Sequence, residues 1–135
     1  MNILGINYFY HDTSACVVRD GELVTAVEEE RFTRVKHTWQ FPYNAIRRAL
    51  QEAELEAGDI TDVAVSIDPG RHRRRKLAFA ISLGRGAASF LKHEFYRAWN
   101  REREFAAWFR ATFPGRRPPR LHRVGHHEAH ILGSF

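Results

Sequence analysis

The stretch that decides the fold is residues 2–30, NILGINYFYHDTSACVVRDGELVTAVEEE. It contains three runs in which apolar residues predominate, each short enough to form a strand. The runs cover residues 2–7, 13–19 and 22–30. Asp20 and Gly21 separate the second and third runs, and an Asp-Gly pair favours the positive φ angles of a two-residue hairpin turn. We therefore predict three consecutive antiparallel strands, with an aromatic loop over residues 8–12 between the first two.

Helical and strand patterns alternate over the rest of the chain. The predicted elements are a helix between Pro42 and Gly58, a strand over residues 61–67, a helical region over residues 76–113 interrupted near Gly84 and Gly86, and a strand over residues 121–124. Helical crossovers favour parallel additions to a sheet, whereas the first three strands are antiparallel by their connections. We predict an α/β fold, a ribonuclease-H-like mixed five-stranded sheet with helices.

Composition bounds the class of protein. The chain has 135 residues, 44% of them hydrophobic and 27% charged, which suits one globular domain over residues 1–135. The N-terminus has neither a basic region nor a long apolar stretch, which argues against a signal peptide, a membrane span and a membrane partner. Cys16 has no second cysteine with which to form a disulfide, and its apolar surroundings favour a buried residue over a nucleophile. We expect a cytoplasmic protein.

The net charge of +5 is spread unevenly. The excess lies in residues 71–76, RHRRRK, and again near residues 116–120, whereas residues 1–70 are close to neutral or acidic. A basic run of this kind is either a solvated helix start or a patch that binds phosphate or RNA. A basic RNA-binding module is therefore kept as an alternative function.

Three histidines occur within residues 126–130, HHEAH, directly after the last predicted strand. On a helix, His126 and His130 would share one face, with Cβ atoms about 5–6 Å apart, so that both imidazoles can reach one metal ion. The zinc-protease motif is absent, because Glu128 does not follow the first histidine directly. The spacing leaves two interpretations open, a metal site or a polar helix start with solvated or capping histidines.

Three stretches together resemble one enzyme family. They are ILGINYFYHDTSA (residues 3–15), EEERFTRVKH (residues 28–37) and HHEAH (residues 126–130). In this order they resemble the N-terminus of the NodU/CmcH-type O-carbamoyltransferases, closely over residues 1–40 and 121–135 and loosely between them. The predicted topology is similar to the first lobe of the actin/sugar-kinase/Hsp70-type fold, which this resemblance also implies.

The resemblance implies a reaction in two parts. Carbamoyl phosphate and ATP give carbamoyl adenylate in a C-terminal YrdC-like domain, and the carbamoyl group then passes to a hydroxyl of a small-molecule or sugar acceptor. The family's metal ligands correspond here to His126 and His130, and the metal is divalent, usually iron. His11 and the adjoining Asp12 would face the acceptor or the carbamoyl group.

These residue types suit the implied chemistry. A hydroxyl is a poor nucleophile near neutral pH, and a histidine or aspartate within hydrogen-bonding reach can take its proton. A metal can polarise a carbonyl as a Lewis acid. Arg34 and Lys36 could stabilise phosphate charge, or could simply be a surface pair beside the acidic residues 28–30.

The chain lacks several parts that the resemblance implies. Two histidines are too few for a catalytic metal, which normally has at least three protein ligands. The family's third ligand is an aspartate of the second lobe, and this lobe and the YrdC-like domain would act in cis or in trans. We expect the chain to be the N-terminal piece of a longer enzyme and to be inactive alone. A second alternative is a domain of the related threonylcarbamoyl-transfer type.

Overall fold

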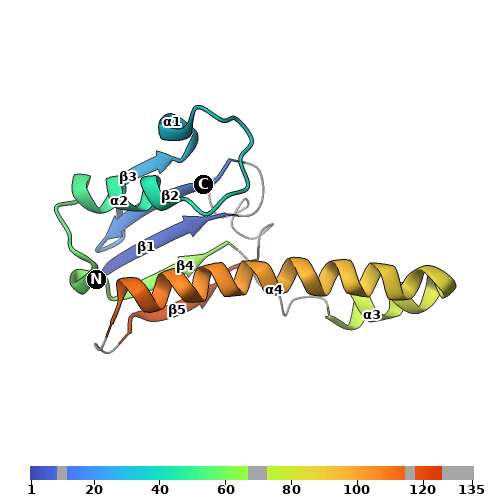
Figure 1. The fold of residues 1–135 in the computed structure, drawn as a ribbon. Helices are drawn as coiled ribbons and strands as arrows, with labels where there is room; N and C mark the ends of the chain where they lie inside the picture. The colour runs from blue at the N-terminus through green and yellow to red at the C-terminus, as the bar shows by residue number, and fades with distance from the viewer. Residues whose placement is uncertain (9–11, 67–72, 115–117, 126–135) are drawn as a thin grey trace. The chain divides into compact units, whose positions relative to one another are not determined.

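A computed structural model describes residues 1–8, 12–66, 73–114 and 118–125 of the chain (Figure 1). The chain forms two compact units, each described here by itself. The sheet unit comprises Met1–Asp68 and Arg110–Phe135, and the helical unit comprises Pro69–Phe109. No helix in these described ranges combines the length and apolar character needed to cross a membrane.

A mixed five-stranded sheet forms the centre of the sheet unit (Figure 1). Its strands are β1 (Asn2–Asn7), β2 (Ser14–Arg19), β3 (Glu22–Glu28), β4 (Asp62–Val65) and β5 (Arg120–Arg123). They lie in the order β3-β2-β1-β4-β5, with β2 antiparallel to both β1 and β3, and β4 parallel to both β1 and β5. The predicted α/β fold with a mixed five-stranded sheet is confirmed, and its ribonuclease-H-like assignment stays a prediction.

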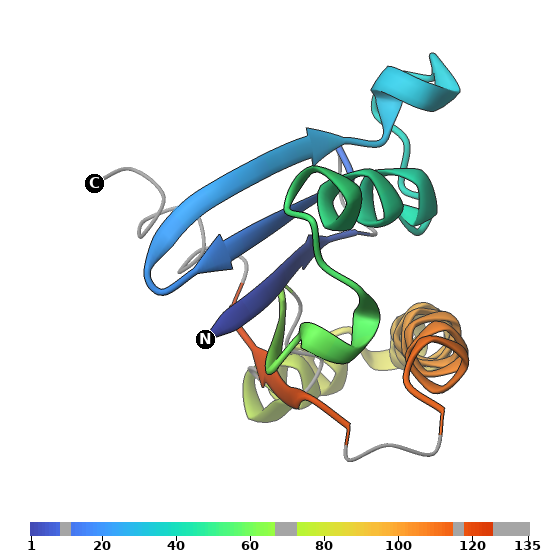
Figure 2. The same ribbon diagram turned by 90° about the vertical axis from the view of Figure 1, so that its left-hand side faces the viewer.

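One face of the sheet forms the core of this unit. Leu4 of β1 lies opposite Val17 of β2 and Val63 of β4, and all three side chains are fully buried. Helix α2 (Tyr43–Glu52) packs against β2 and β3, as Figure 2 shows. Its buried face consists of Ala45, Ile46 and Ala49. The small alanines let the helix lie close to the strands.

The hairpin turn and one close contact in the first three strands have clear causes in the sequence. Asp20 and Gly21 adopt φ angles of 52° and 92°, so the predicted hairpin turn is confirmed. Gly5 pairs with Cys16 across β1 and β2, and a Cβ atom at Gly5 would lie 2.6 Å from the Cys16 Sγ atom. Burial raises the pKa of the Cys16 thiol, which supports the expectation of a packing residue rather than a nucleophile.

The observed elements differ from the predicted ones at their ends. The third strand stops at Glu28, because Glu29 has helical backbone angles and the short helix α1 (Glu30–Thr33) follows. Helix α2 ends at Glu52 rather than near Gly58, which instead lies in a 3-10 turn, η1 (Ala57–Asp59). The predictions for residues 29–30 and for the helix end were therefore wrong.

The helical unit contains helix α3 (Arg73–Ser82), the 3-10 turn η2 (Gly84–Gly86) and most of helix α4 (Ala87–Thr112). The predicted interruption at Gly84 and Gly86 is confirmed, and Gly84 has a positive φ of 53°. The Phe79 and Phe90 rings meet edge to face with centroids 5.3 Å apart, which joins the two helices across the turn. Three further rings of α4 form a cluster with centroids 5.6–6.3 Å apart, those of Phe105, Trp108 and Phe109.

Candidate functional site

The carboxyl ends of β1 and β4 meet at one edge of the sheet, where ligands commonly bind in α/β folds. Asn7 is the last residue of β1, and Ser66 directly follows β4. The Ser66 hydroxyl donates a hydrogen bond to Asn7 Oδ1 at 2.5 Å. The Asn7 amide in turn donates from Nδ2 to the backbone carbonyl of Asp12 at 3.2 Å. Both polar atoms of the Asn7 side chain are thus bonded, and one of these bonds fixes the backbone carbonyl of Asp12.

Asp12 is paired with His37. Asp12 has a φ of 61°, a left-handed conformation in which aspartate is enriched, and its side chain is about half exposed. Its Oδ1 atom lies 3.2 Å from His37 Nδ1, although the two residues are 25 positions apart. An ionised carboxylate only accepts hydrogen bonds, so Nδ1 carries the proton. In a neutral imidazole this leaves the other ring nitrogen, Nε2, able to accept a proton.

The segment after α1 brings His37 to Asp12. Helix α1 is followed by Arg34, whose φ of 59° is left-handed and whose backbone N–H donates to the Glu30 carbonyl at 2.9 Å. His37 itself has a φ of 55°. A right-handed helix cannot continue through these two left-handed residues, so α1 stops before the segment that carries His37.

A second polar cluster joins β5 to β4. Asp62, whose side chain is 4% exposed, accepts hydrogen bonds from His122 Nε2 at 2.7 Å and from Arg120 Nη2 at 3.2 Å. The His122 hydrogen bond first, and then those from Thr61 and Arg120, lower the pKa of Asp62 to about 2. The backbone N–H of Val124 continues the pairing by donating to the Val65 carbonyl at 2.9 Å. This cluster fixes the strand that leads into residues 126–130.

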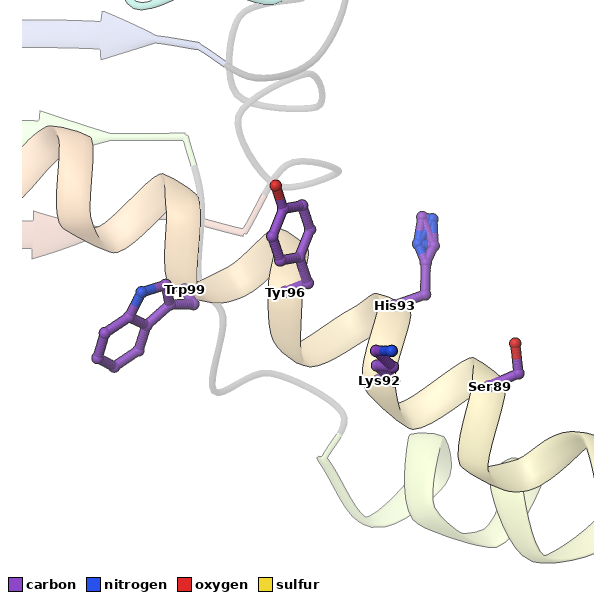
Figure 3. A pocket seen from close by; sticks show the side chains of 5 residues that line it. All are labelled: Ser89, Lys92, His93, Tyr96 and Trp99. Atoms are coloured by element: carbon purple, nitrogen blue, oxygen red, sulfur yellow. The ribbon is translucent and has the colours of Figure 1, made fainter.

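An exposed stretch of α4 carries polar and aromatic side chains (Figure 3). Ser89, Lys92, His93, Tyr96 and Trp99 line a cavity of about 620 Å³. Ser89, His93 and Tyr96 are spaced by four and three residues and point to the same side of the helix, whereas Trp99 points away from them (Figure 3). Tyr96 and Trp99 are 65% and 59% exposed. Exposed aromatic side chains can stack on a flat ring, and a neighbouring cation such as Lys92 can bind a phosphate.

Comparison with known proteins identifies the family of this chain. The family model described as "Carbamoyltransferase N-terminus" matches residues 2–131, nearly the whole chain. The chain belongs to this family. The matched range includes all three stretches on which the resemblance rests, residues 3–15, 28–37 and 126–130.

Relatives of this carbamoyltransferase N-terminal domain are longer proteins. An uncharacterised protein of Synechocystis is 40% identical over 94 residues, 67% of this chain and 15% of the relative. Nodulation protein NolNO of Sinorhizobium fredii is 43% identical over 58 residues, 43% of this chain and 8% of the relative. An uncharacterised 19.2 kDa protein of Rhizobium etli is 41% identical over 58 residues, 43% of this chain and 34% of the relative. The chain thus spans less than a fifth of the first two relatives.

The predicted site residues of the carbamoyltransferase domain fall into three groups. Asp12 lies at the edge of the sheet described above. Arg34 and Lys36 are exposed on the segment between α1 and His37, and within the part of the chain that the structure describes neither is bonded to Asp12. His11, His126 and His130 lie outside the described residues. The predicted catalytic, substrate-binding and metal roles therefore stay predictions.

Sequence reasoning missed three residues of this edge. His37 closes the stretch EEERFTRVKH, and its place at the end of that motif was the available signal. Asn7 and Ser66 each stand at the end of a parallel strand, where polar residues often serve a site. Among the residues that are described, no three His, Cys, Asp or Glu side chains gather closely enough to hold a metal ion.

Proposed function

We propose that this chain is the acceptor- and metal-binding N-terminal part of a cytoplasmic O-carbamoyltransferase. The enzyme would move a carbamoyl group from carbamoyl phosphate, by way of carbamoyl adenylate, to a hydroxyl of a small molecule or sugar. Membership of the family over residues 2–131 supports carbamoyl transfer in general. The observation that carries the site assignment is the pairing of Asp12 with His37, because it joins two of the three family-like stretches at a sheet edge suited to binding.

The pair can prepare a hydroxyl for attack. The Asp12 carboxylate holds the proton on His37 Nδ1, which leaves Nε2 as the proton acceptor. A histidine base in reach of the hydroxyl contributes roughly 10²–10⁴-fold to a transfer rate. His11 directly precedes Asp12 and is proposed as the group nearest the acceptor or the carbamoyl carbon. Asn7 fixes the Asp12 backbone, so the reacting groups would keep their geometry.

In the proposed transfer step, the carbamoyl carbon exchanges its bond to the adenylate for a bond to the acceptor. The acceptor oxygen forms a bond to the carbamoyl carbon, and its proton passes to Nε2 of His37. The bond from that carbon to the phosphate oxygen of the adenylate breaks, and AMP leaves. Arg34 and Lys36 are proposed to neutralise phosphate charge, since both are exposed on the segment that ends at His37.

His126 and His130 are proposed as two ligands of a divalent metal, with iron the first candidate. Neutral imidazoles bind such ions, and the third ligand would come from beyond these residues. When bound, the metal would act as a Lewis acid on a carbonyl or phosphate oxygen. Titration with Fe²⁺ or Zn²⁺ should show binding that His130→Ala abolishes and that His127→Ala leaves nearly intact. Equal loss from single substitutions at all three histidines would contradict the assignment.

The function is tested in two arms. The isolated 135-residue chain should form no adenylate from carbamoyl phosphate and ATP and should transfer no carbamoyl group. In a longer enzyme that contains this chain, His11→Ala should lower carbamoyl transfer at least about 100-fold and leave adenylate formation nearly unchanged. Robust turnover by the isolated chain, or parallel loss of both half-reactions in the variant, would reject the proposal.

RNA binding is a second candidate function because charge gathers in the helical unit. Pro69–Phe109 holds ten Lys and Arg against three Glu, a net charge of +7, and exposes Tyr96 and Trp99. Binding of single-stranded RNA by phosphate contacts should weaken by orders of magnitude between low and moderate salt. Titration with polyuridine at two salt concentrations tests this, with Tyr96→Ala as the variant and Tyr43→Ala, an exposed tyrosine of the sheet unit, as its control. An affinity independent of salt or of Tyr96 would exclude this function.

A further inference from the structure

Glu29 is a buried acid in an otherwise accessible acidic run. Its neighbours Glu28 and Glu30 are exposed and half-buried, whereas Glu29 is 3% exposed. A buried carboxylate is costly unless hydrogen bonds satisfy both of its oxygens. The partners that satisfy Glu29 therefore indicate why an acid stands at this position.

The Glu29 carboxylate caps the N-terminus of α2. Its Oε2 atom accepts the backbone N–H of Ala45 at 2.7 Å, and its Oε1 atom accepts Asn44 Nδ2 at 2.7 Å and the Asn44 backbone N–H at 3.4 Å. Asn44 and Ala45 are the second and third residues of the helix, whose first N–H groups have no partner within it. The residue in the capping position is Pro42, which has no side-chain acceptor. A negative charge here also interacts favourably with the helix dipole.

The backbone of Glu29 reaches the two segments that form the Asp12–His37 pair. Its N–H donates to the carbonyl of Thr13, the residue after Asp12, at 2.9 Å. Its carbonyl accepts the N–H groups of Phe32 and Thr33 at 3.0 and 3.2 Å, which begins the helical turn that leads to His37. One buried residue therefore joins the start of β2, helix α1 and the start of α2.

We propose that Glu29 is a positioning residue for the Asp12–His37 pair: by anchoring its carboxylate on α2, it holds both segments at their pairing distance. The catalytic meaning of this role depends on the proposed function, whereas the positioning itself does not. Since a displacement of about 1 Å in a reacting group can cost roughly 100-fold in rate, a loosened anchor at Glu29 should reduce transfer without any direct contact to substrate.

The test compares three variants of the chain. Glu29→Gln keeps the shape but removes the charge, and turns a donor toward the N–H groups of α2. Glu28→Gln is the control at an exposed glutamate. The double variant Glu29→Gln/Asn44→Asp exchanges amide and carboxylate, so that the introduced amide can accept the Ala45 N–H and donate to the introduced carboxylate. The measurements are the melting temperature and the NMR signals of the Asp12 amide and the His37 ring.

We expect Glu29→Gln to lower the melting temperature by about 3–8 °C, as expected for a lost helix cap, and to displace the signals of Asp12 and His37. The double variant should restore both, and Glu28→Gln should change neither. If Glu29→Gln lowers the melting temperature while the Asp12 and His37 signals stay in place, Glu29 is only a helix cap and the proposal is wrong. If Glu29→Gln unfolds the chain, the double variant decides. Asp12 and His37 signals at their original positions in the double variant would support the anchoring role of Glu29, and signals that remain displaced would overturn it.

The same variants in the longer enzyme separate the two proposals. Glu29→Gln should lower carbamoyl transfer at least about 10-fold, and the double variant should restore it. If the NMR signals move but transfer is unaffected even by Asp12→Asn, the function proposed for the pair fails while the positioning role stands.

Discussion

Phe41 packs against two tyrosine rings, and this packing should contribute measurably to the stability of the chain. Phe41 is 2% exposed, and its ring centroid lies 5.1 Å from that of Tyr8 and 4.9 Å from that of Tyr43. Tyr8 is 1% exposed and directly follows Asn7, so this packing holds the end of β1 from which Asn7 bonds Asp12.

Phe41→Leu should lower the free energy of unfolding by about 1–2 kcal/mol. The lost aromatic pairing accounts for roughly 0.5–1.5 kcal/mol. The volume difference between the side chains, roughly 25 Å³ at about 24 cal/mol per Å³, adds about 0.6 kcal/mol if the site does not collapse. The melting temperature should fall by roughly 3–8 °C.

Urea denaturation is the assay, because a shifted midpoint with an unchanged slope reports stability alone. Trp39→Leu is the matched control: Trp39 is an aromatic residue two positions away but 64% exposed, and its substitution should change stability by less than about 0.5 kcal/mol. If Phe41→Leu destabilises the chain no more than Trp39→Leu does, the packing argument is refuted.

Two further predictions concern the sheet. Because the pKa of Asp62 is lowered to about 2 by its bonds to His122, Thr61 and Arg120, its contribution to stability should be complete above about pH 4 and lost as the pH falls toward 2. Acid titration of unfolding should show this loss, and Asp62→Asn should remove it; an unchanged acid profile in the variant would contradict the role of the cluster. Gly5→Ala should cost about 1–3 kcal/mol, because the new Cβ would lie 2.6 Å from Cys16 Sγ, and Cys16→Ala in the same chain should recover most of this cost. An additive double variant in denaturant melts would show that the two side chains do not compete for space.

The sheet could be predicted from the sequence because its causes are local. Alternating and continuous apolar runs mark the strands, and Asp20 with Gly21 supplies the turn that joins two of them. The end of β3 could not be predicted in the same way. It depends on Glu29, whose carboxylate is held by residues 15 and 16 positions further along the chain.

The candidate site could also be predicted only in part, because it too depends on contacts between residues that are far apart in sequence. Asp12 stands in a recognisable motif, and Asn7 at the end of β1 donates to its backbone carbonyl, while its catalytic role stays a prediction. Its partner His37 is 25 residues away, on a segment after α1 in which Arg34 and His37 adopt left-handed backbone angles. Asn7 and Ser66 contribute through a contact between strands that are far apart in sequence, which a linear pattern does not reveal.

The proposed role of the Asp12–His37 pair is tested most directly by the rate of carbamoyl transfer in a longer enzyme carrying Asp12→Asn, measured separately from its rate of adenylate formation. Asparagine keeps the size of the side chain but weakens the acceptor that holds the His37 proton. We expect transfer to fall at least about 100-fold while adenylate formation and the melting temperature stay near their original values. Unchanged transfer, or an equal loss of both half-reactions, would contradict it.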